Sequence, residues 1–239
     1  MDEIRVGMVG TGFAADFHTR CFGQVTGLQA RVVAVTSKQE EHRQAFAERF
    51  GIPGVYATLD EMLDAEELDV VDLCVPTYVH GQYIVQAAQA GRHVIVEKPL
   101  TGYTGEVGVD DELIGNTVPR QHMMDWVLEQ CRMIEDAITD AGIKLMYAEN
   151  WVYAPALQKA RRLIEASRGV VLRMVAEESH NGSHASYAKY WRLAGGGSLL
   201  RTGSHPVGGV LYLKQAEGLA RDGKPIRPRT VVAEVGRLT

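Results

Sequence analysis

The chain has 239 residues, 46% of them hydrophobic and 23% charged, which is an ordinary globular composition with room for one large core or two smaller ones. A formal net charge of −5 argues against nucleic-acid and acidic-membrane partners, because both require clustered positive charge. No apolar run is long enough to span a bilayer, and the acidic N-terminus does not resemble a signal peptide. Three scattered cysteines without a CxxC pair indicate reduced thiols in a cytoplasmic protein.

Short apolar runs alternate with helical stretches along the first 148 residues. The expected strands cover residues 4–9, 31–35, 70–75, 94–96 and 143–148. The expected helices cover residues 14–24, 39–50, 60–64, 78–90 and 121–141. This alternation predicts an α/β fold with a doubly wound parallel sheet, in which the carboxyl ends of all strands lie at one edge. A loop insertion near residues 101–119 interrupts the pattern.

A different pattern begins at residue 149. We expect a basic amphipathic helix over residues 154–166 and extended strands over residues 170–176 and 229–235. The chain is therefore divided into a first domain over 1–148 and a second, partial domain over 149–239.

Two glycines follow the first expected strand and open the first expected helix, in the pattern Gly10-x-Gly12-x-x-Ala15. Such glycines permit a tight turn and close approach of the backbone to a pyrophosphate, and the helix N-terminus adds free N–H groups. This context favours a dinucleotide site over a plain turn, with Phe13 and Ala14 beside the cofactor.

The second expected strand runs into Ser37 and Lys38, where NAD sites usually carry an acidic residue for the ribose 2′-OH. A serine hydroxyl can donate a hydrogen bond to a phosphate, and a lysine supplies positive charge. The pair favours NADP, or use of both NADP and NAD. The alternative interpretation is a solvated turn.

The fourth expected strand ends in Glu97, Lys98 and Pro99. Pro99 lacks an N–H, so it ends the strand and stiffens the turn that carries the lysine. A lysine at this edge can reach a nicotinamide ring and a substrate lying on it, although an ordinary surface lysine is the simpler interpretation. The loop after the third strand can cover the cofactor with three more residues, Pro76, Thr77 and His80. His80 can equally cap its helix at the surface.

Taken together, these motifs resemble the glucose–fructose oxidoreductase, inositol dehydrogenase and MocA (Gfo/Idh/MocA) family. The matching elements, in chain order, are Gly10-x-Gly12-Phe13 with His18, Asp72-Leu73-Cys74-Val75-Pro76-Thr77 with His80, Glu97-Lys98-Pro99, Asn150-x-x-Tyr153-x-Pro155, and Gly195-Gly196-Gly197-Ser198-Leu199-Leu200 leading to Gly203 and His205. The resemblance implies an N-terminal Rossmann domain and a C-terminal α+β domain with a mainly antiparallel open sheet, truncated at Thr239.

The resemblance also implies that Lys98 and His205 flank a substrate hydroxyl and handle its oxygen and proton during hydride transfer. His205 can equally be a buried histidine at a helix start, and both readings can hold together. Arg201 stands where the family often has an aspartate. It can clamp an anionic group of the substrate or form an internal salt bridge. The remaining candidates for the substrate wall are aromatic, amide and imidazole side chains: Trp151, Tyr153, Asn181, His184 and Tyr187. The alternative for Trp151 and Tyr153 is packing at the domain interface, which is the simpler interpretation for at least one of them.

We therefore expect an NAD(P)-dependent oxidoreductase that transfers a hydride between the nicotinamide and a carbinol carbon of a sugar, polyol or related hydroxy compound, including acidic ones. Two alternatives stay open: an NAD-dependent glycoside hydrolase that recycles its cofactor, and a non-catalytic dinucleotide sensor. We expect a small-molecule substrate, no metal, and a homo-oligomer formed through the C-terminal sheet.

Overall fold

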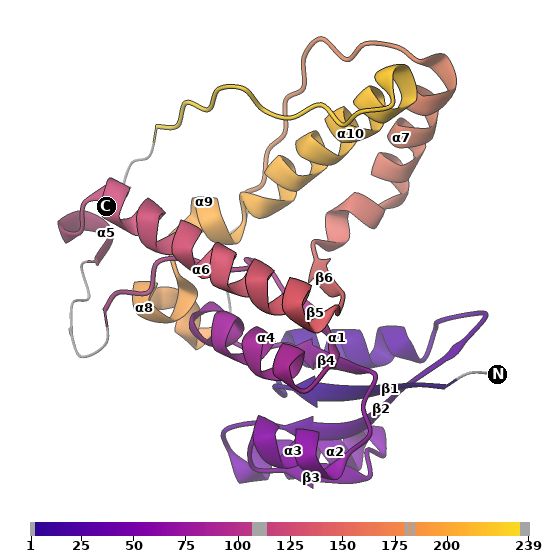
Figure 1. Cartoon of the computed structure of the whole chain (residues 1–239), viewed down its shortest axis with the longest axis vertical. Coiled ribbons are helices and arrows are strands. Elements are labelled where there is room, and N and C mark those ends of the chain that lie inside the picture. Colours follow the sequence, from indigo (N-terminus) through magenta and orange to yellow (C-terminus); the bar gives the residue numbers. More distant parts are fainter. Residues whose placement is uncertain (1–2, 107–113, 180–181, 183–184, 235–239) are drawn as a thin grey trace. The chain divides into compact units, whose positions relative to one another are not determined.

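The computed structural model describes residues 3–106, 114–179, 182 and 185–234 (Figure 1). The chain forms two compact units. The first comprises Met1–Ala148 and Gly182–Arg201, and the second comprises Glu149–Asn181 and Thr202–Thr239. Residues 182–201, which the sequence placed in the second domain, therefore pack with the first unit.

A six-stranded parallel sheet forms the centre of the first unit, in the order β3-β2-β1-β4-β5-β6. Its strands are β1 (Glu3–Val9), β2 (Gln29–Thr36), β3 (Gly54–Tyr56), β4 (Val70–Leu73), β5 (His93–Glu97) and β6 (Leu145–Ala148). The strand order runs one way from β1 and the other way from β4, so the switch point of the sheet lies between these two strands. The predicted doubly wound Rossmann sheet is confirmed.

Helices cover both faces of this sheet (Figure 1). They are α1 (Phe13–Phe22), α2 (Glu40–Phe50), α3 (Leu59–Ala65), α4 (His80–Gln89) and α6 (Arg120–Ala141), with a short 3-10 turn η1 (Thr77–Val79) before α4. Ala15 of α1 and Phe46 of α2 belong to one buried cluster, whereas Met62 of α3, Ile84 of α4 and Ile134 of α6 belong to the other. Each large buried side chain contributes about 1.5–3 kcal/mol, so the two clusters fix the helices on the sheet.

The second segment of the first unit packs against the chain after β5. It contains η3 (Ser186–Lys189), α8 (Trp191–Ala194) and α9 (Ser198–Arg201). Trp191 Nε1 donates to the carbonyl oxygen of Tyr103 at 2.8 Å. A Cβ on Gly102 would lie 2.4 Å from the carbonyl oxygen of Gly195, so the two backbones can approach this closely only through glycine.

The predicted loop insertion contains a buried residue and a short helix. Tyr103 is buried, and α5 (Ile114–Thr117) follows. Residues 107–113 lie outside the described residues.

A helical hairpin forms the second unit. It consists of η2 (Asn150–Tyr153), α7 (Pro155–Ser167) and α10 (Ser204–Asp222). Gln158 Nε2 of α7 donates to Tyr212 Oη of α10 at 2.8 Å. The carboxylate of Glu217 is buried and accepts from Lys214 Nζ at 2.6 Å and from the backbone N–H of Val171 at 3.1 Å.

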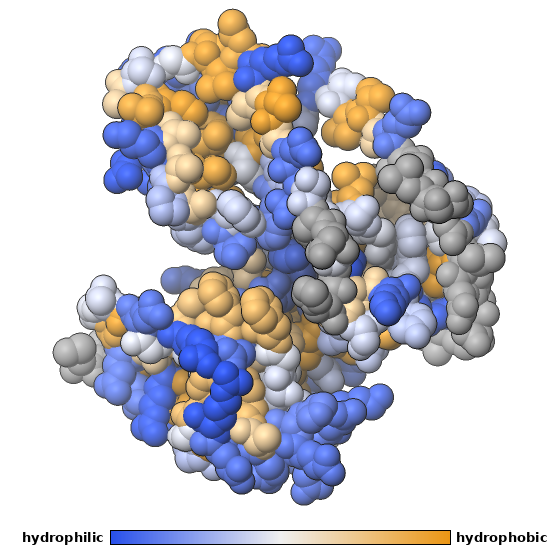
Figure 2. All heavy atoms as spheres, turned by 180° about the vertical axis from the view of Figure 1, so that it is seen from behind, coloured by the Kyte–Doolittle hydropathy of each residue, from blue (hydrophilic) through white to orange (hydrophobic). Residues whose placement is uncertain are grey.

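Irregular backbone takes the place of the strands expected in this unit. Residues 170–176 and 229–234 form no strand within the described part of the chain, and Leu172, Val175 and Val232 are exposed there. Figure 2 shows apolar side chains at the surface of the unit. A strand needs a hydrogen-bonded neighbour, and the described residues of this unit supply none. The antiparallel sheet stays a prediction. Among the described helices, none is long and apolar enough to cross a bilayer.

Candidate active site

The glycine turn between β1 and α1 lies at the switch point of the sheet. Gly10 has φ +107°, its N–H donates to the Thr36 carbonyl at 2.8 Å, and a Cβ there would lie 2.2 Å from the Cys74 carbonyl oxygen. Gly12 is exposed, and no described atom lies within 4 Å of the position its Cβ would take. Gly10 thus allows the turn to pack closely against the end of β4. Gly12 leaves open space in front of the first N–H groups of α1, and an anion in that space could accept hydrogen bonds from them.

Phe13 and Ala14 form the first turn of α1, as predicted from the sequence. The Phe13 side chain is 89% exposed and stacks on Phe17, with ring centroids 6.5 Å apart. Ala14 is half-buried. Both residues therefore border the open space at Gly12.

The turn after β2 carries more positive charge than the sequence indicated. Lys38 is exposed, and Arg43 of α2 donates from Nη1 to the Ser37 carbonyl at 3.2 Å. Sequence reasoning missed Arg43 because it lies one helical turn into α2, and its direction toward Ser37 appears only in the fold. Ser37 donates from Oγ to the Gln39 carbonyl at 3.2 Å.

His80, expected to contact the cofactor or to cap a helix at the surface, is instead buried. Its Nε2 lies 2.9 Å from the carbonyl oxygen of Val75, and its Nδ1 lies 3.0 Å from that of Pro99. The ring joins the loop after β4 to the turn after β5. Burial lowers the pKa of His80, against the opposing effect of these carbonyls. Thr77 is buried at the start of η1, next to the half-buried Pro76.

Lys98 directly follows β5 and is held at both ends. Its backbone N–H donates to Glu97 Oε2 at 3.1 Å, and its Nζ donates to the Arg201 carbonyl at 3.1 Å. The Lys98 side chain is therefore hydrogen-bonded to another segment of the first unit, unlike a free surface lysine.

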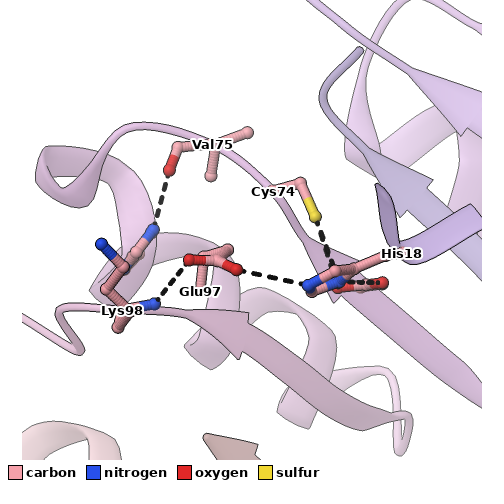
Figure 3. Close-up of polar contacts among 7 residues, drawn as sticks. His18, Cys74, Val75, Glu97 and Lys98 are labelled. Atoms are coloured by element: carbon pink, nitrogen blue, oxygen red, sulfur yellow. Dashed lines mark hydrogen bonds and ion pairs between the residues drawn. The ribbon is translucent and has the colours of Figure 1, made fainter. Parts of the chain in front are cut away.

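A polar cluster lies beside Lys98 (Figure 3). His18 Nδ1 lies 2.9 Å from Asp72 Oδ2, and His18 Nε2 lies 3.2 Å from Glu97 Oε1. Cys74 Sγ lies 3.4 Å from His18 Nδ1. Burial alone would lower the pKa of His18, but the hydrogen bonds with Asp72, Cys74 and Glu97 outweigh it and raise that pKa.

Three side chains of this cluster are of kinds that bind metals. The ligand atoms of His18, Asp72 and Cys74 lie within 4.8 Å of one another. The 2.9 Å separation of His18 Nδ1 from Asp72 Oδ2 is that of a direct hydrogen bond. The cluster therefore fits a proton-linked network better than a metal centre.

The thiol of Cys74 should be far less reactive than that of Cys21. Burial raises the pKa of Cys74 to about 12, so at about pH 8 it is almost wholly the unreactive thiol. Cys21 is exposed on α1. Alkylation followed by peptide mass spectrometry should label Cys21 at least about tenfold faster. Equal labelling rates would show that Cys74 is accessible as a thiolate.

Arg201 lies at the end of α9, where its carbonyl accepts from Lys98. Its guanidinium carbon lies 5.8 Å from the centre of the Tyr187 ring, a cation–π arrangement. The substrate clamp inferred from the sequence stays a prediction. Two further substrate candidates, Asn181 and His184, lie outside the described residues.

The second unit holds His205 at the start of α10, together with a carboxylate that the sequence did not single out. His205 Nδ1 lies 2.7 Å from Glu149 Oε1, and Glu149 is buried. The His205 ring lies 6.1 Å from that of Trp151, whereas Tyr153 is 74% exposed. Glu149 is thus placed to orient the His205 ring. Sequence reasoning missed it because 56 residues separate the pair.

The first unit defines a dinucleotide-binding protein of the Rossmann class, since its glycine turn lies at the switch point and opens the N-terminus of α1. Residues 4–107 match the family model described as Gfo/Idh/MocA oxidoreductase family, NAD-binding Rossmann fold. The match covers residues 4–107 of the first unit, and the resemblance inferred from the motifs is confirmed there.

Known relatives include dehydrogenases of sugars. Levoglucosan dehydrogenase of Pseudarthrobacter phenanthrenivorans is 25% identical over 228 residues, covering 89% of this chain and 52% of that protein. D-xylose 1-dehydrogenase (NADP(+)) 2 of Haloferax volcanii is 26% identical over 155 residues, covering 65% of this chain and 40% of that protein. Among solved structures, GenD2 from gentamicin A biosynthesis, in complex with NAD, is 25% identical with a TM-score of 0.69 and covers 89% of this chain and 54% of that one. The chain spans about half the length of these relatives or less.

Proposed function

We propose that the chain binds NAD(P) at the carboxyl edge of its sheet. We further propose that it is part of an enzyme that oxidises or reduces CH–OH groups, with Lys98 as the catalytic residue. The observation that carries the proposal is the placement of Lys98. It directly follows β5, next to β4 and the switch point, on the edge where α/β sheets bind ligands.

The residues at this edge fit a dinucleotide. The open space at Gly12 admits a pyrophosphate to the N-terminus of α1, and Phe13 borders it. Ser37, Lys38 and Arg43 supply a hydroxyl and two cations at the end of β2, which favours a 2′-phosphate and hence NADP over NAD. The nicotinamide, when bound, supplies the hydride acceptor or donor.

Lys98 is suited to the oxygen of the reacting carbinol. An ammonium has three N–H donors, so the bond to the Arg201 carbonyl leaves donors for a substrate oxygen. Its positive charge stabilises the negative charge that develops on that oxygen during hydride transfer. The amine can also exchange a proton with it.

The relatives' names favour a sugar or polyol as substrate. We also propose that His205, oriented by Glu149, moves a proton in the reaction, and that Arg201 selects an anionic group. The homo-oligomer and the cytoplasmic location stay proposals from the sequence.

Cofactor titration and turnover of the full chain test this function. Fluorescence titration should show tighter binding of NADPH than of NADH by about tenfold, or about 1.4 kcal/mol. A panel of sugars, polyols and sugar acids should then reduce the oxidised cofactor stoichiometrically, which a glycoside hydrolase with a recycled cofactor would not do. Failure to bind either cofactor contradicts the proposal, as does binding without turnover on the whole panel. Tighter binding of NADH contradicts only the NADP preference.

A further inference from the structure

We propose that His18 is a positioning residue for Lys98. Its imidazolium donates hydrogen bonds to the carboxylates of Asp72 and Glu97. Glu97 in turn accepts a hydrogen bond from the backbone N–H of Lys98. The inference deepens the proposed function and rests on the catalytic role of Lys98.

The contacts form one continuous path across three elements of the first unit (Figure 3). Asp72 on β4 is fully buried and lies 2.9 Å from His18 Nδ1. The other ring nitrogen lies 3.2 Å from Glu97 Oε1 at the end of β5. The second oxygen of Glu97 accepts the backbone N–H of Lys98 at 3.1 Å. Helix α1 is thereby linked to the turn that presents the lysine.

Both ring nitrogens of His18 face carboxylate oxygens, which accept but do not donate when ionised. With both carboxylates ionised, two donors on one ring require the imidazolium. A buried carboxylate such as Asp72 is costly unless it is paired with a cation, and His18 is the partner placed for it. The neighbouring Cys74 stays neutral and donates from Sγ to Asp72 Oδ1 at 3.6 Å. The cluster therefore holds two negative charges and one positive charge.

Removal of the imidazolium would leave two carboxylates without their shared cation. Burial raises the pKa of Asp72 against the opposing effect of His18, and the charge of Glu97 raises it further, so without His18 the two carboxylates would separate. Glu97 is at the accessible end of the cluster, with 21% of its side chain exposed against none for Asp72. Glu97 would turn toward solvent and release the N–H of Lys98. The lysine would then lose the position that turnover needs, while the glycine turn at Gly12 would be unchanged.

Three variants of the full chain test the inference: His18→Gln, Lys98→Met and the control His93→Gln. His93 is a half-buried histidine at the other end of β5, where its Nδ1 accepts the Lys144 N–H at 3.2 Å. His18→Gln should lower kcat by about tenfold to a hundredfold and leave the Kd of NADPH within about twofold. Amide hydrogen exchange at Lys98 should be faster in His18→Gln and unchanged in His93→Gln.

The outcomes separate this inference from the proposed function. If Lys98→Met abolishes turnover but His18→Gln keeps full kcat and slow exchange at Lys98, His18 is not a positioning residue. If Lys98→Met keeps full turnover, the proposed function itself fails.

A measurement on the unmodified chain decides the matter should His18→Gln not fold. Nitrogen-15 NMR of the imidazole rings should show both nitrogens of His18 protonated at about pH 9, well above the ordinary histidine pKa of about 6.5. A neutral ring at that pH would overturn the proposal.

Discussion

Gly10→Ala should destabilise the first unit by about 3 kcal/mol or more. The residue has φ +107°, a conformation that costs an L-residue on the order of 1–2 kcal/mol, and its new methyl would lie 2.2 Å from the Cys74 carbonyl oxygen. Backbone cannot move aside as a flexible side chain can, so overpacking adds about 1–3 kcal/mol. Urea unfolding, followed by circular dichroism, measures the loss.

Gly12→Ala is the matched control for this substitution, because the two glycines belong to one turn but have different surroundings. Gly12 has φ −83°, and no described atom lies within 4 Å of its Cβ position. Its stability should therefore change by less than about 0.5 kcal/mol. The methyl instead enters the space before α1, so the Kd of NADPH should rise at least about tenfold. Unchanged cofactor affinity in Gly12→Ala would mean that the pyrophosphate does not bind there.

Most of the first unit could be predicted from the sequence because the central strands of its sheet are largely buried. Runs such as 32–35 and 94–96 are continuously apolar, which is typical of a central parallel strand. The exception is β3, which has three residues and contains Gly54. It forms because its backbone pairs with β2 at the edge of the sheet, a tertiary contact that no local pattern indicates.

The second unit was less predictable because its apolar runs have no partner strand among the described residues. Residues 170–176 have the composition of a strand, but a strand is stable only beside a partner, and propensity does not supply one. Residues 182–201 also lack a strong pattern. They pack with the first unit through glycine contacts and the Trp191 hydrogen bond, which depend on the folded position of Tyr103.

Some residues of the candidate site could likewise be predicted from local patterns, whereas others come together only in the fold. Gly12 and Lys98 could be found because a turn and a strand end are visible in the sequence. His18 and Asp72 were noted only as elements of a family motif, and their pairing across 54 residues requires the sheet to bring α1 next to β4. The burial of His80 was likewise unpredictable, because its carbonyl partners lie in two separate loops.

Lys98→Met should lower turnover by about 10²–10⁴-fold, the usual effect of removing a group that transfers a proton or stabilises charge in the reaction. Methionine keeps an unbranched side chain of similar length but has no charge and no N–H. The fold should be nearly unaffected, because the substitution removes the half-buried hydrogen bond from Nζ to the Arg201 carbonyl, which is worth about 1 kcal/mol. The Kd of NADPH should stay within about twofold, since the glycine turn is intact.

Two controls complete the experiment. Lys144→Met removes an exposed lysine just before β6, at the opposite edge of the sheet, and should keep full turnover. Lys98→Arg keeps the positive charge but cannot deprotonate, so it separates charge stabilisation from proton transfer. Partial turnover in Lys98→Arg would mean that charge is the larger contribution, and complete loss would point to proton transfer or to the fixed geometry of the amine. Full turnover in Lys98→Met would remove the catalytic assignment, because no charge or donor would then be left at the end of the Lys98 side chain.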